Sequence, residues 1–148
     1  MKPIVLRNDL SRAAAKREID AAPENYEATV LAPSKTRDQE NAYHAIFDEV
    51  ARQCTHLNQR FDREGWKRLL VDQFRTEALA LPDLDQLIRD DLTGCVKMVP
   101  SLDGSSIVAI GLQTRKFKRK TAALLLEWLN AWCAQKDVRL AAPERMAA

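Results

Sequence analysis

In three parts of the chain a hydrophobic residue recurs at every third or fourth position, which is the spacing of one face of an α-helix. Thr36 and Gln39 precede the first part with the spacing of a capping box, in which each side chain bonds a free backbone amide of the other. Asp62 can cap the second helix, and the third covers residues 121–133. The hydrophobic faces carry, in chain order, Tyr43, Ile46, Phe47, Val50 and Cys54, then Trp66, Leu69, Leu70 and Phe74, then Leu125, Trp128, Leu129 and Trp132.

Two short segments near the N-terminus have the pattern of strands. Residues 3–6 form an apolar run, and residues 26–31 alternate and are rich in β-branched side chains. Between them, Asn8 or Asp9 can cap a helix over residues 10–20, which is rich in Ala, Arg and Lys. The N-terminal part is therefore predicted to be a strand, a helix and a second strand.

A β-hairpin is predicted further along the chain. Residues 95–100 and 106–110 are strand-like, and Asp103-Gly104 between them is a signal for a tight turn. The segment 81–92, just before the hairpin, has a weaker pattern, for which we predict one or two helical turns after Pro82.

These elements predict an α+β fold, in which small sheets (the N-terminal strands and the central hairpin) pack with three or four helices. A chain of 148 residues can bury a core, and we expect a single domain over residues 1–138. Within it, residues 1–32 form the strand-helix-strand part, residues 35–94 the helical part, and residues 95–138 the hairpin with the last helix. Residues 139–148 are small and polar, as is typical of a flexible tail.

Composition narrows the class of protein. Apolar residues make up 46% and charged residues 30% of the chain, which is the balance of a globular domain. Cys54, Cys95 and Cys133 are odd in number and far apart, which fits a reducing compartment without disulfides. No apolar run has the length of a membrane span, and the N-terminus lacks a signal-peptide core. We expect a soluble protein of the cytoplasm that contacts no membrane.

The strongest local signal is positive charge. The net charge is only +2, so attraction to an anionic partner depends on where the cations lie and not on their total. Five of the six residues from Arg115 to Lys120 are cationic and stand at the start of the last helix, where the helix dipole makes each cation cost roughly 0.3–1 kcal/mol. Lys35 and Arg37 flank the Thr36 cap in the same way. Such helix starts suit a phosphate, although a solvated basic loop explains the same residues.

Candidate catalytic chemistry is sparse. Cys54 and His56 form a C-x-H pair, but no second pair at zinc spacing accompanies it. No phosphate-binding loop, nucleophile elbow or dinucleotide loop is visible. Four carboxylates follow Thr36 along one helix, as a metal-dependent nuclease would need, but dipole compensation and a surface pair with His44 explain two of them. The four are Asp38, Glu40, Asp48 and Glu49. We expect no catalytic residue, no bound metal and no cofactor.

The aromatic residues have two kinds of candidate role. Trp66, Trp128 and Trp132 fall on hydrophobic helical faces, so we expect burial in a core or a subunit interface rather than base stacking. The last helix is more apolar than a surface helix needs, which indicates a subunit interface. Phe117 lies between two lysines and off any clear stripe. It either staples the helix start or stacks on a base, and the sequence leaves both roles open.

Three blocks of residues together resemble the NinB/Orf family of bacteriophage recombination proteins. The first is Thr36-Arg-Asp-Gln-Glu-Asn-Ala, and the second is Phe61-Asp-Arg-Glu-Gly-Trp66-Lys67. The third runs from Val99-Pro-Ser-Leu-Asp-Gly104 through Ile107-Val-Ala-Ile-Gly111 to Lys116 and a leucine-rich helix. The resemblance covers residues 36–140.

The resemblance implies a recombination mediator without catalytic activity, which binds single-stranded DNA and the host single-strand-binding protein and helps a phage or host recombinase, or an annealing protein, to load. It also implies an intertwined homodimer of α+β subunits in the cytoplasm of the bacterial host. By position, the family's DNA-contacting helix start falls on Gln39 and its basic segment on Lys116. Glu40 replaces the usual Asn, His44 stands where a tryptophan can occur, and an extra segment near residues 76–93 precedes the hairpin.

We therefore expect single-stranded DNA to bind two cationic helix starts, residues 35–39 and 115–120, with little dependence on base sequence. Two alternatives stay open: a metal-dependent nuclease acting on recombination intermediates, and a protein adaptor that makes no DNA contact. The expected DNA-binding residues are Lys35, Arg37, Gln39, His44, Arg115, Lys116, Lys118, Arg119 and Lys120.

Overall fold

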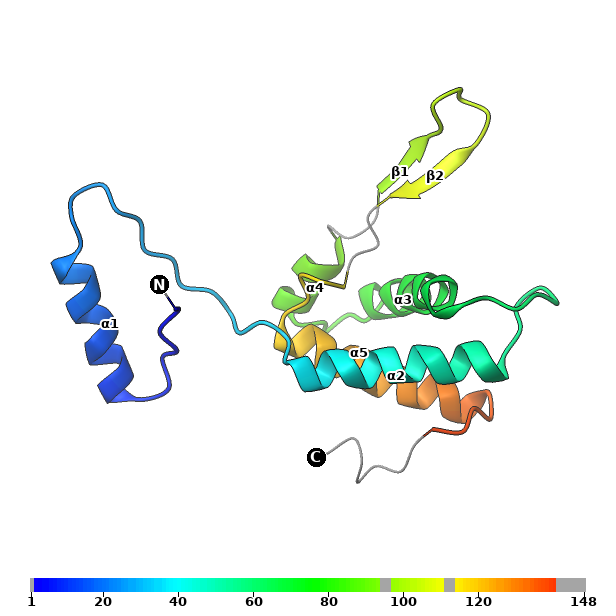
Figure 1. The fold of residues 1–148 in the computed structure, drawn as a ribbon, viewed down its shortest axis with the longest axis horizontal. Helices are drawn as coiled ribbons and strands as arrows, with labels where there is room; N and C mark the ends of the chain where they lie inside the picture. Colours follow the sequence, from blue (N-terminus) through cyan, green and yellow to red (C-terminus); the bar gives the residue numbers. More distant parts are fainter. Residues whose placement is uncertain (1, 94–96, 111–113, 141–148) are drawn as a thin grey trace. The chain divides into compact units, whose positions relative to one another are not determined.

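The computed structural model describes residues 2–93, 97–110 and 114–140 (Figure 1). The contact pattern divides the chain into two compact units, Met1–Leu31 and Ala32–Ala148. The described part contains five helices and one two-stranded sheet, which confirms the predicted α+β class. None of the described helices is long and apolar enough to cross a membrane. Most of the predicted tail, residues 141–148, lies outside the described residues.

The first unit is built around α1 (Asp9–Ala21), the helix predicted in this region. Asn8 caps the helix. Its side chain accepts a hydrogen bond from the Ser11 amide at 2.9 Å, and the Ser11 hydroxyl accepts one from the Asn8 amide at 3.1 Å. No residue of α1 is buried, so the helix relies on local bonds and not on a core.

The two strands predicted in this unit, residues 3–6 and 26–31, are not formed, and that prediction was wrong. Side-chain alternation shows that a segment can pair, but a strand exists only where a second strand bonds its backbone. In the described part of the chain no partner strand lies beside either segment. Their apolar side chains remain in solvent, with Val5 59% and Val30 84% exposed.

The second unit holds four helices: α2 (Arg37–Gln53), α3 (Arg63–Leu79), α4 (Gln86–Thr93) and α5 (Arg119–Gln135). The short helix α4 is the weakly patterned segment, and it confirms the one or two turns predicted there. The last helix begins two residues earlier than predicted. Its first turn therefore contains two of the cations of the basic stretch.

The predicted helix starts of α2 and α3 are confirmed. The Thr36 hydroxyl accepts a hydrogen bond from the Gln39 amide at 3.0 Å, and Gln39 Oε1 accepts one from the Thr36 amide at 2.9 Å. The Asp62 carboxylate accepts a hydrogen bond from the Gly65 amide at 2.8 Å. These bonds satisfy backbone donors that a helix start leaves unpaired.

The core lies where α2, α3 and α5 meet, and α4 packs against it. The Trp66 side chain is 4% exposed, and its ring packs on Trp132 with centroids 6.1 Å apart. Trp128 packs on Phe74 at 5.9 Å. The tryptophans thus serve packing, as predicted. The buried residues of the predicted stripes are Tyr43, Ile46, Phe47, Val50, Trp66, Leu70, Phe74, Leu125 and Leu129.

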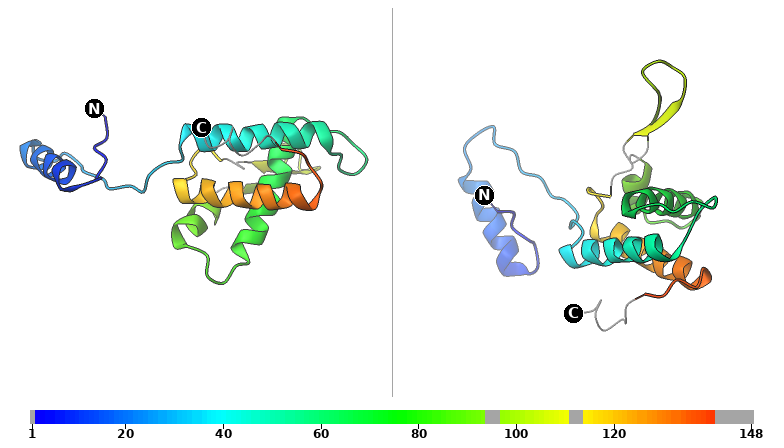
Figure 2. Two further views of the ribbon diagram at one scale, coloured as in Figure 1. Left: turned by 90° about the horizontal axis from the view of Figure 1, so that it is seen from below. Right: turned by 45° about the vertical axis from the view of Figure 1, so that its right-hand side comes forward.

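Helices α2 and α5 lie side by side and run in the same direction, so both start at the same end of the unit (Figure 2). Hydrogen bonds join them at both ends. At the start, Gln39 Nε2 donates to the Arg119 carbonyl at 3.2 Å. At the far end, Gln53 Nε2 donates to the Arg139 carbonyl at 2.8 Å, and Gln53 Oε1 accepts from the Arg139 amide at 2.9 Å. These bonds fix the alignment of the two helices along their length.

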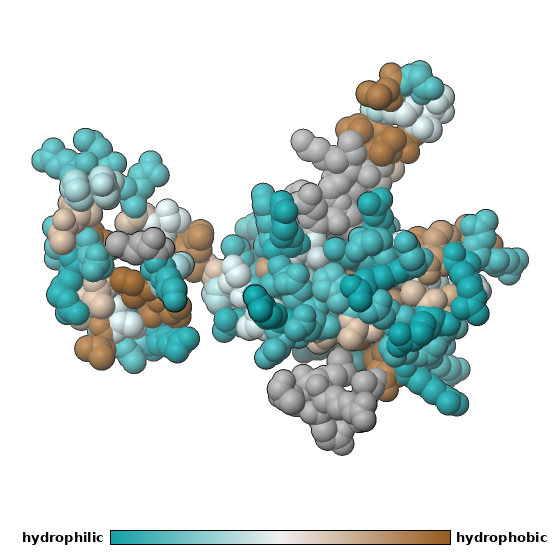
Figure 3. Space-filling model, viewed as in Figure 1, coloured by the Kyte–Doolittle hydropathy of each residue, from teal (hydrophilic) through white to brown (hydrophobic). Residues whose placement is uncertain are grey.

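The predicted hairpin is present, with β1 (Lys97–Pro100) antiparallel to β2 (Ile107–Ile110). Gly104 in the turn has a φ of +73°, a left-handed conformation that glycine adopts without steric cost. Residues 95–96 of the predicted first strand lie outside the described residues. Hydrophobic residues gather on the hairpin surface (Figure 3).

Candidate nucleic-acid interface

The segments that lead into α2 and α5 pair with each other just before the two helices begin. The Lys35 amide donates to the Phe117 carbonyl at 3.2 Å, and the Arg119 amide donates to the Pro33 carbonyl at 2.9 Å. A short antiparallel bridge lies between these bonds. The structure therefore brings together the two cationic helix starts that the sequence singled out.

Side chains reinforce this junction. Lys35 Nζ donates to the Arg115 carbonyl at 2.5 Å. The Gln39 side chain bonds in two directions, because Oε1 accepts from the Thr36 amide while Nε2 donates to the Arg119 carbonyl. Gln39 was predicted to cap the helix and to contact DNA as well. Both ends of its amide are engaged inside the fold, so its role here is to hold the two helix starts in register.

Seven cationic side chains surround this junction, and we call them the basic surface. Because α2 and α5 are parallel, the positive ends of both helix dipoles lie at the same place and add to the side-chain charge. Five of the seven residues are exposed and two are half-buried. The basic surface consists of Lys35, Arg37, Arg115, Lys116, Lys118, Arg119 and Lys120.

The extra segment before the hairpin supplies two carboxylates to this junction, Asp85 just before α4 and Asp91 within it. The N-cap of α5 is Lys118, whose side chain cannot accept a hydrogen bond. Asp91 Oδ2 accepts from the amide of this N-cap residue at 2.8 Å and from the Thr121 hydroxyl at 2.6 Å. Asp85 accepts from Lys120 Nζ at 3.2 Å, and this bond lowers the pKa of the Asp85 carboxyl.

The anion expected at the start of α5 thus comes from the chain itself. This internal carboxylate offsets part of the charge of the five cations in the six-residue stretch around the start of α5. Within the described residues, no ion pair involves the side chains of Arg37, Arg115, Lys116, Lys118 and Arg119.

Phe117 is only 2% exposed, although it lies between Lys116 and Lys118. It occupies the position before the α5 N-cap, from which a hydrophobic staple packs inward, and it belongs to the core cluster. Of the two roles left open by the sequence, the structure supports the staple. The buried ring is not accessible to a base.

His44 has a different environment from the basic surface. Its ring packs on those of Tyr43 and Phe47, with centroids 4.9 and 5.9 Å away, and its Nε2 lies 3.9 Å from a Glu40 carboxylate oxygen. Burial, followed by the positive charge of Lys67, lowers the pKa of His44. Its described contacts come from α2 and the α3 side, and none comes from the basic surface.

The carboxylates that the nuclease alternative needs are partly engaged in ion pairs. Arg63 donates two hydrogen bonds to the two oxygens of Asp48, at 2.6 and 2.5 Å, and these bonds lower the pKa of Asp48. Glu49 accepts from Arg52 and Gln53. Among the described residues, no three His, Cys, Asp or Glu side chains are placed to hold one metal ion. The geometry gives this alternative no support.

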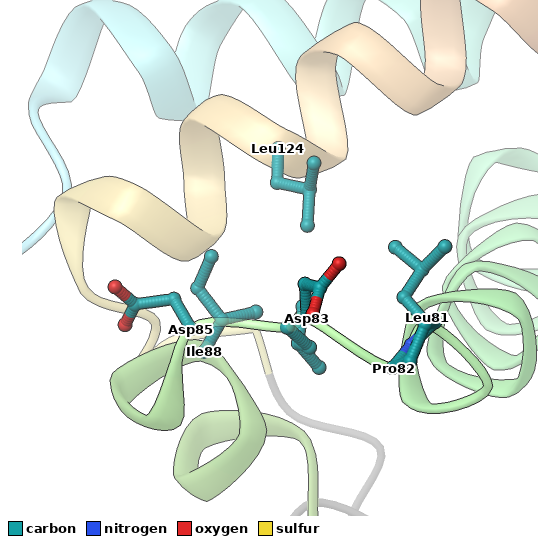
Figure 4. A pocket seen from close by; sticks show the side chains of 7 residues that line it. Leu81, Pro82, Asp83, Asp85, Ile88 and Leu124 are labelled. Atoms are coloured by element: carbon teal, nitrogen blue, oxygen red, sulfur yellow. The ribbon is translucent and has the colours of Figure 1, made fainter.

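A pocket of about 310 Å³ opens between α4, the connection from α3 to α4, and α5 (Figure 4). Its lining is mainly aliphatic and includes no histidine or nucleophile. Asp85 borders the pocket and pairs with Lys120, so the pocket adjoins the basic surface. The lining residues are Leu81, Pro82, Asp83, Leu84, Asp85, Ile88 and Leu124.

Sequence reasoning missed Asp85 and Asp91 as parts of this junction. Both lie in the least clearly patterned segment, and acidic residues in a short helix have many local explanations. One signal was available in the sequence. A lysine in front of a strong helix offers no acceptor, so that helix start requires an acceptor from elsewhere in the fold.

The fold and the basic surface define a small α+β protein with cations concentrated at two parallel helix starts. The chain belongs to the NinB family, because the family model described as NinB protein matches residues 1–141. A solved structure described as "Structural Genomics, NinB" is similar in fold, with a TM-score of 0.52 and 20% sequence identity over 99% of this chain and 94% of that chain. No curated protein matches the chain. The family resemblance seen in the three residue blocks is confirmed, and the chain is a phage recombination-related protein.

Proposed function

We propose that this protein is a phage recombination mediator that binds single-stranded DNA through the basic surface and catalyses no reaction. In this role it assists the loading of a phage or host recombinase, or of an annealing protein, together with the host single-strand-binding protein. The observation that carries the proposal is the junction of two cationic helix starts, where five cations have no ion pair within the described residues. Side chains of this kind neutralise phosphates without reading bases.

Electrostatics gives this proposal a measurable form. Each phosphate that a cation neutralises releases counterions, so the logarithm of the affinity falls linearly with the logarithm of salt concentration. For single strands the slope is about −0.7 for each phosphate, so five contacts predict a slope of about −3.5. A protein adaptor that makes no DNA contact predicts no such binding.

The test is a fluorescence-anisotropy titration of a labelled single strand at several salt concentrations. Neutralising the centre of the basic surface is expected to remove most of the affinity. A matched control removes three positive charges at the opposite end of the α2–α5 pair, and this variant is expected to keep its affinity for DNA. Equal effects of the two triple variants, or none, would contradict the site. The variants are Lys116→Gln, Lys118→Gln and Arg119→Gln against Arg52→Gln, Lys136→Gln and Arg139→Gln.

The proposal includes a homodimer. Met98 and Ile107 on the hairpin are 62% and 71% exposed. An isolated two-stranded hairpin is marginally stable in water, and exposed apolar patches mark interaction surfaces. Analytical ultracentrifugation is expected to give a dimer for the unaltered chain and a lower mass for an Ile107→Glu variant. A monomer at every concentration of the unaltered chain would overturn this part of the proposal.

The nuclease alternative is separated by incubating a labelled single strand with the protein and Mg²⁺ or Mn²⁺. We expect the strand to stay intact at protein concentrations that saturate binding. Cleavage that depends on the divalent ion and survives repeated purification would establish an enzyme instead.

A further inference from the structure

We propose that the basic surface holds a nucleic acid by its sugar-phosphate backbone alone and leaves the bases free to pair with a complementary strand. This inference rests on the proposed function and adds which part of the strand is bound. It follows from an inventory of the groups at the junction, which separates those engaged inside the fold from those left to a ligand.

Three polar side chains at the junction that could read a base edge are engaged inside the fold. The Gln39 amide, the most versatile of them, bonds Thr36 and Arg119. Asp91 accepts two hydrogen bonds at the α5 start, and Asp85 accepts one from Lys120. Direct readout needs such donors and acceptors to be free and fixed in direction. Their internal bonds withdraw these three side chains from direct readout.

The aromatic rings near the basic surface are also not exposed for base stacking. Base stacking needs an exposed ring beside the cations. Phe117, the one ring within the basic stretch, is 2% exposed. Among the described residues of the second unit, every Phe, Tyr and Trp is buried or half-buried. The groups that project from the junction are therefore the long aliphatic stems and charged heads of Lys and Arg, which suit phosphates.

A guanidinium plane can stack on a base as well as bind a phosphate. Arg37, Arg115 and Arg119 are the exposed arginines of the basic surface. A change of all three to lysine keeps the charge and removes the planes. If phosphates alone are bound, this triple variant keeps the affinity of the unaltered protein within about twofold.

The decisive probe is an abasic strand, which keeps every phosphate and lacks every base. Its affinity is expected to equal that of a thymidine strand of the same length within about twofold. One stacked base would instead make the abasic strand about 5- to 150-fold weaker. A methylphosphonate strand of the same sequence, which keeps the bases and lacks the charge, is expected not to bind.

A second measurement tests whether the bases of the bound strand are free to pair. A complementary strand is expected to anneal to the bound strand at no less than its rate with free strand, measured by a fluorophore and quencher on the two strands. The inference is overturned if the thymidine strand binds tightly while the abasic strand does not bind, or if annealing to the bound strand is blocked. Either result leaves the proposed function standing. Failure of every charged strand to bind overturns both.

Discussion

Asp91 of α4 caps α5 through Thr121, whose hydroxyl donates a hydrogen bond of 2.6 Å to the Asp91 carboxylate. The same oxygen accepts from the amide of Lys118, the N-cap residue, as the side chain of the third helical residue does in a capping box. Because this carboxylate comes from another helix, the Lys118 amide is satisfied without an acceptor in the basic stretch itself. The basic surface can therefore be cationic throughout that stretch.

Replacing Asp91 by Ala is expected to destabilise the fold by about 1–3 kcal/mol, because it leaves the Thr121 hydroxyl, 0% exposed, without its acceptor. Urea denaturation measures the change. Asp90→Ala is the matched control, since the Asp90 side chain is exposed and accepts from Gln86 on the same helix. Its effect is expected to stay within about 0.5 kcal/mol. Equal midpoints for the two variants would show that the external cap contributes nothing.

Substitutions at two neighbouring residues of the basic stretch are expected to have different effects, one on the stability of the fold and the other on DNA binding. Phe117→Ala removes a core ring and is expected to cost about 3–5 kcal/mol. Lys116→Ala is expected to change stability by less than about 0.5 kcal/mol but to weaken DNA binding and reduce the salt slope by about 0.7. If Phe117→Leu, which keeps the fold more intact, weakens binding without loss of stability, the ring contacts the ligand and the staple assignment is wrong.

Asp85→Asn is expected to tighten DNA binding, because it releases Lys120 from its ion pair. The salt slope is expected to steepen by about 0.7, the value for one more phosphate on a single strand. Anisotropy titrations of this variant and of the double variant with Lys120→Gln measure the effect. The double variant should return to the slope of the unaltered chain, and an Asp85→Asn slope that does not change would contradict the prediction.

His44 is expected to make stability depend on pH. Its pKa is lower in the folded state than the ordinary value near 6.5 of the unfolded chain, chiefly because the ring is partly buried. The folded state is therefore favoured above pH 6.5, and this stability is lost as pH falls toward the folded pKa, because the unfolded chain binds the proton first. Urea denaturation near pH 8 and near pH 5 measures the loss.

A His44→Gln variant is expected to lose this part of the pH dependence, while His56→Gln, at an exposed site, serves as the control and keeps it. The same pair of variants tests the DNA role predicted for His44. If His44→Gln weakens binding at neutral pH as strongly as Lys116→Ala does, then His44 belongs to the interface after all.

Local patterns in the sequence predicted what local physics decides. The Thr36–Gln39 box and the Asp62 cap involve residues three positions apart, and the core stripe from Tyr43 to Val50 follows from helical periodicity. The Asp-Gly turn at Gly104 needed only the steric freedom of glycine. For these elements a single chain segment holds all the information.

Elements that need a distant partner were not predictable in this way. The strands at residues 3–6 and 26–31 had suitable side chains but no partner strand in the described chain. The candidate site was half predicted: the two cationic helix starts were identified, but their pairing, the second bond of Gln39 and the carboxylate of Asp91 come from residues far apart in sequence. The sequence around one residue of such a contact does not indicate which distant residue is its partner.

The bonds between the parallel helices α2 and α5 join residues 80 and 86 positions apart, which has a consequence for the order of events during folding. Closing so long a stretch of chain has an entropy cost, and only the contacts between the docked helices offset it. We therefore expect contacts of this range to form late in folding. Because α5 follows α1 to α4 along the chain, a ribosome releases it after those four helices. The basic surface is complete only once α5 has been made, and a fragment that ends before α5 carries Lys35 and Arg37 without the junction.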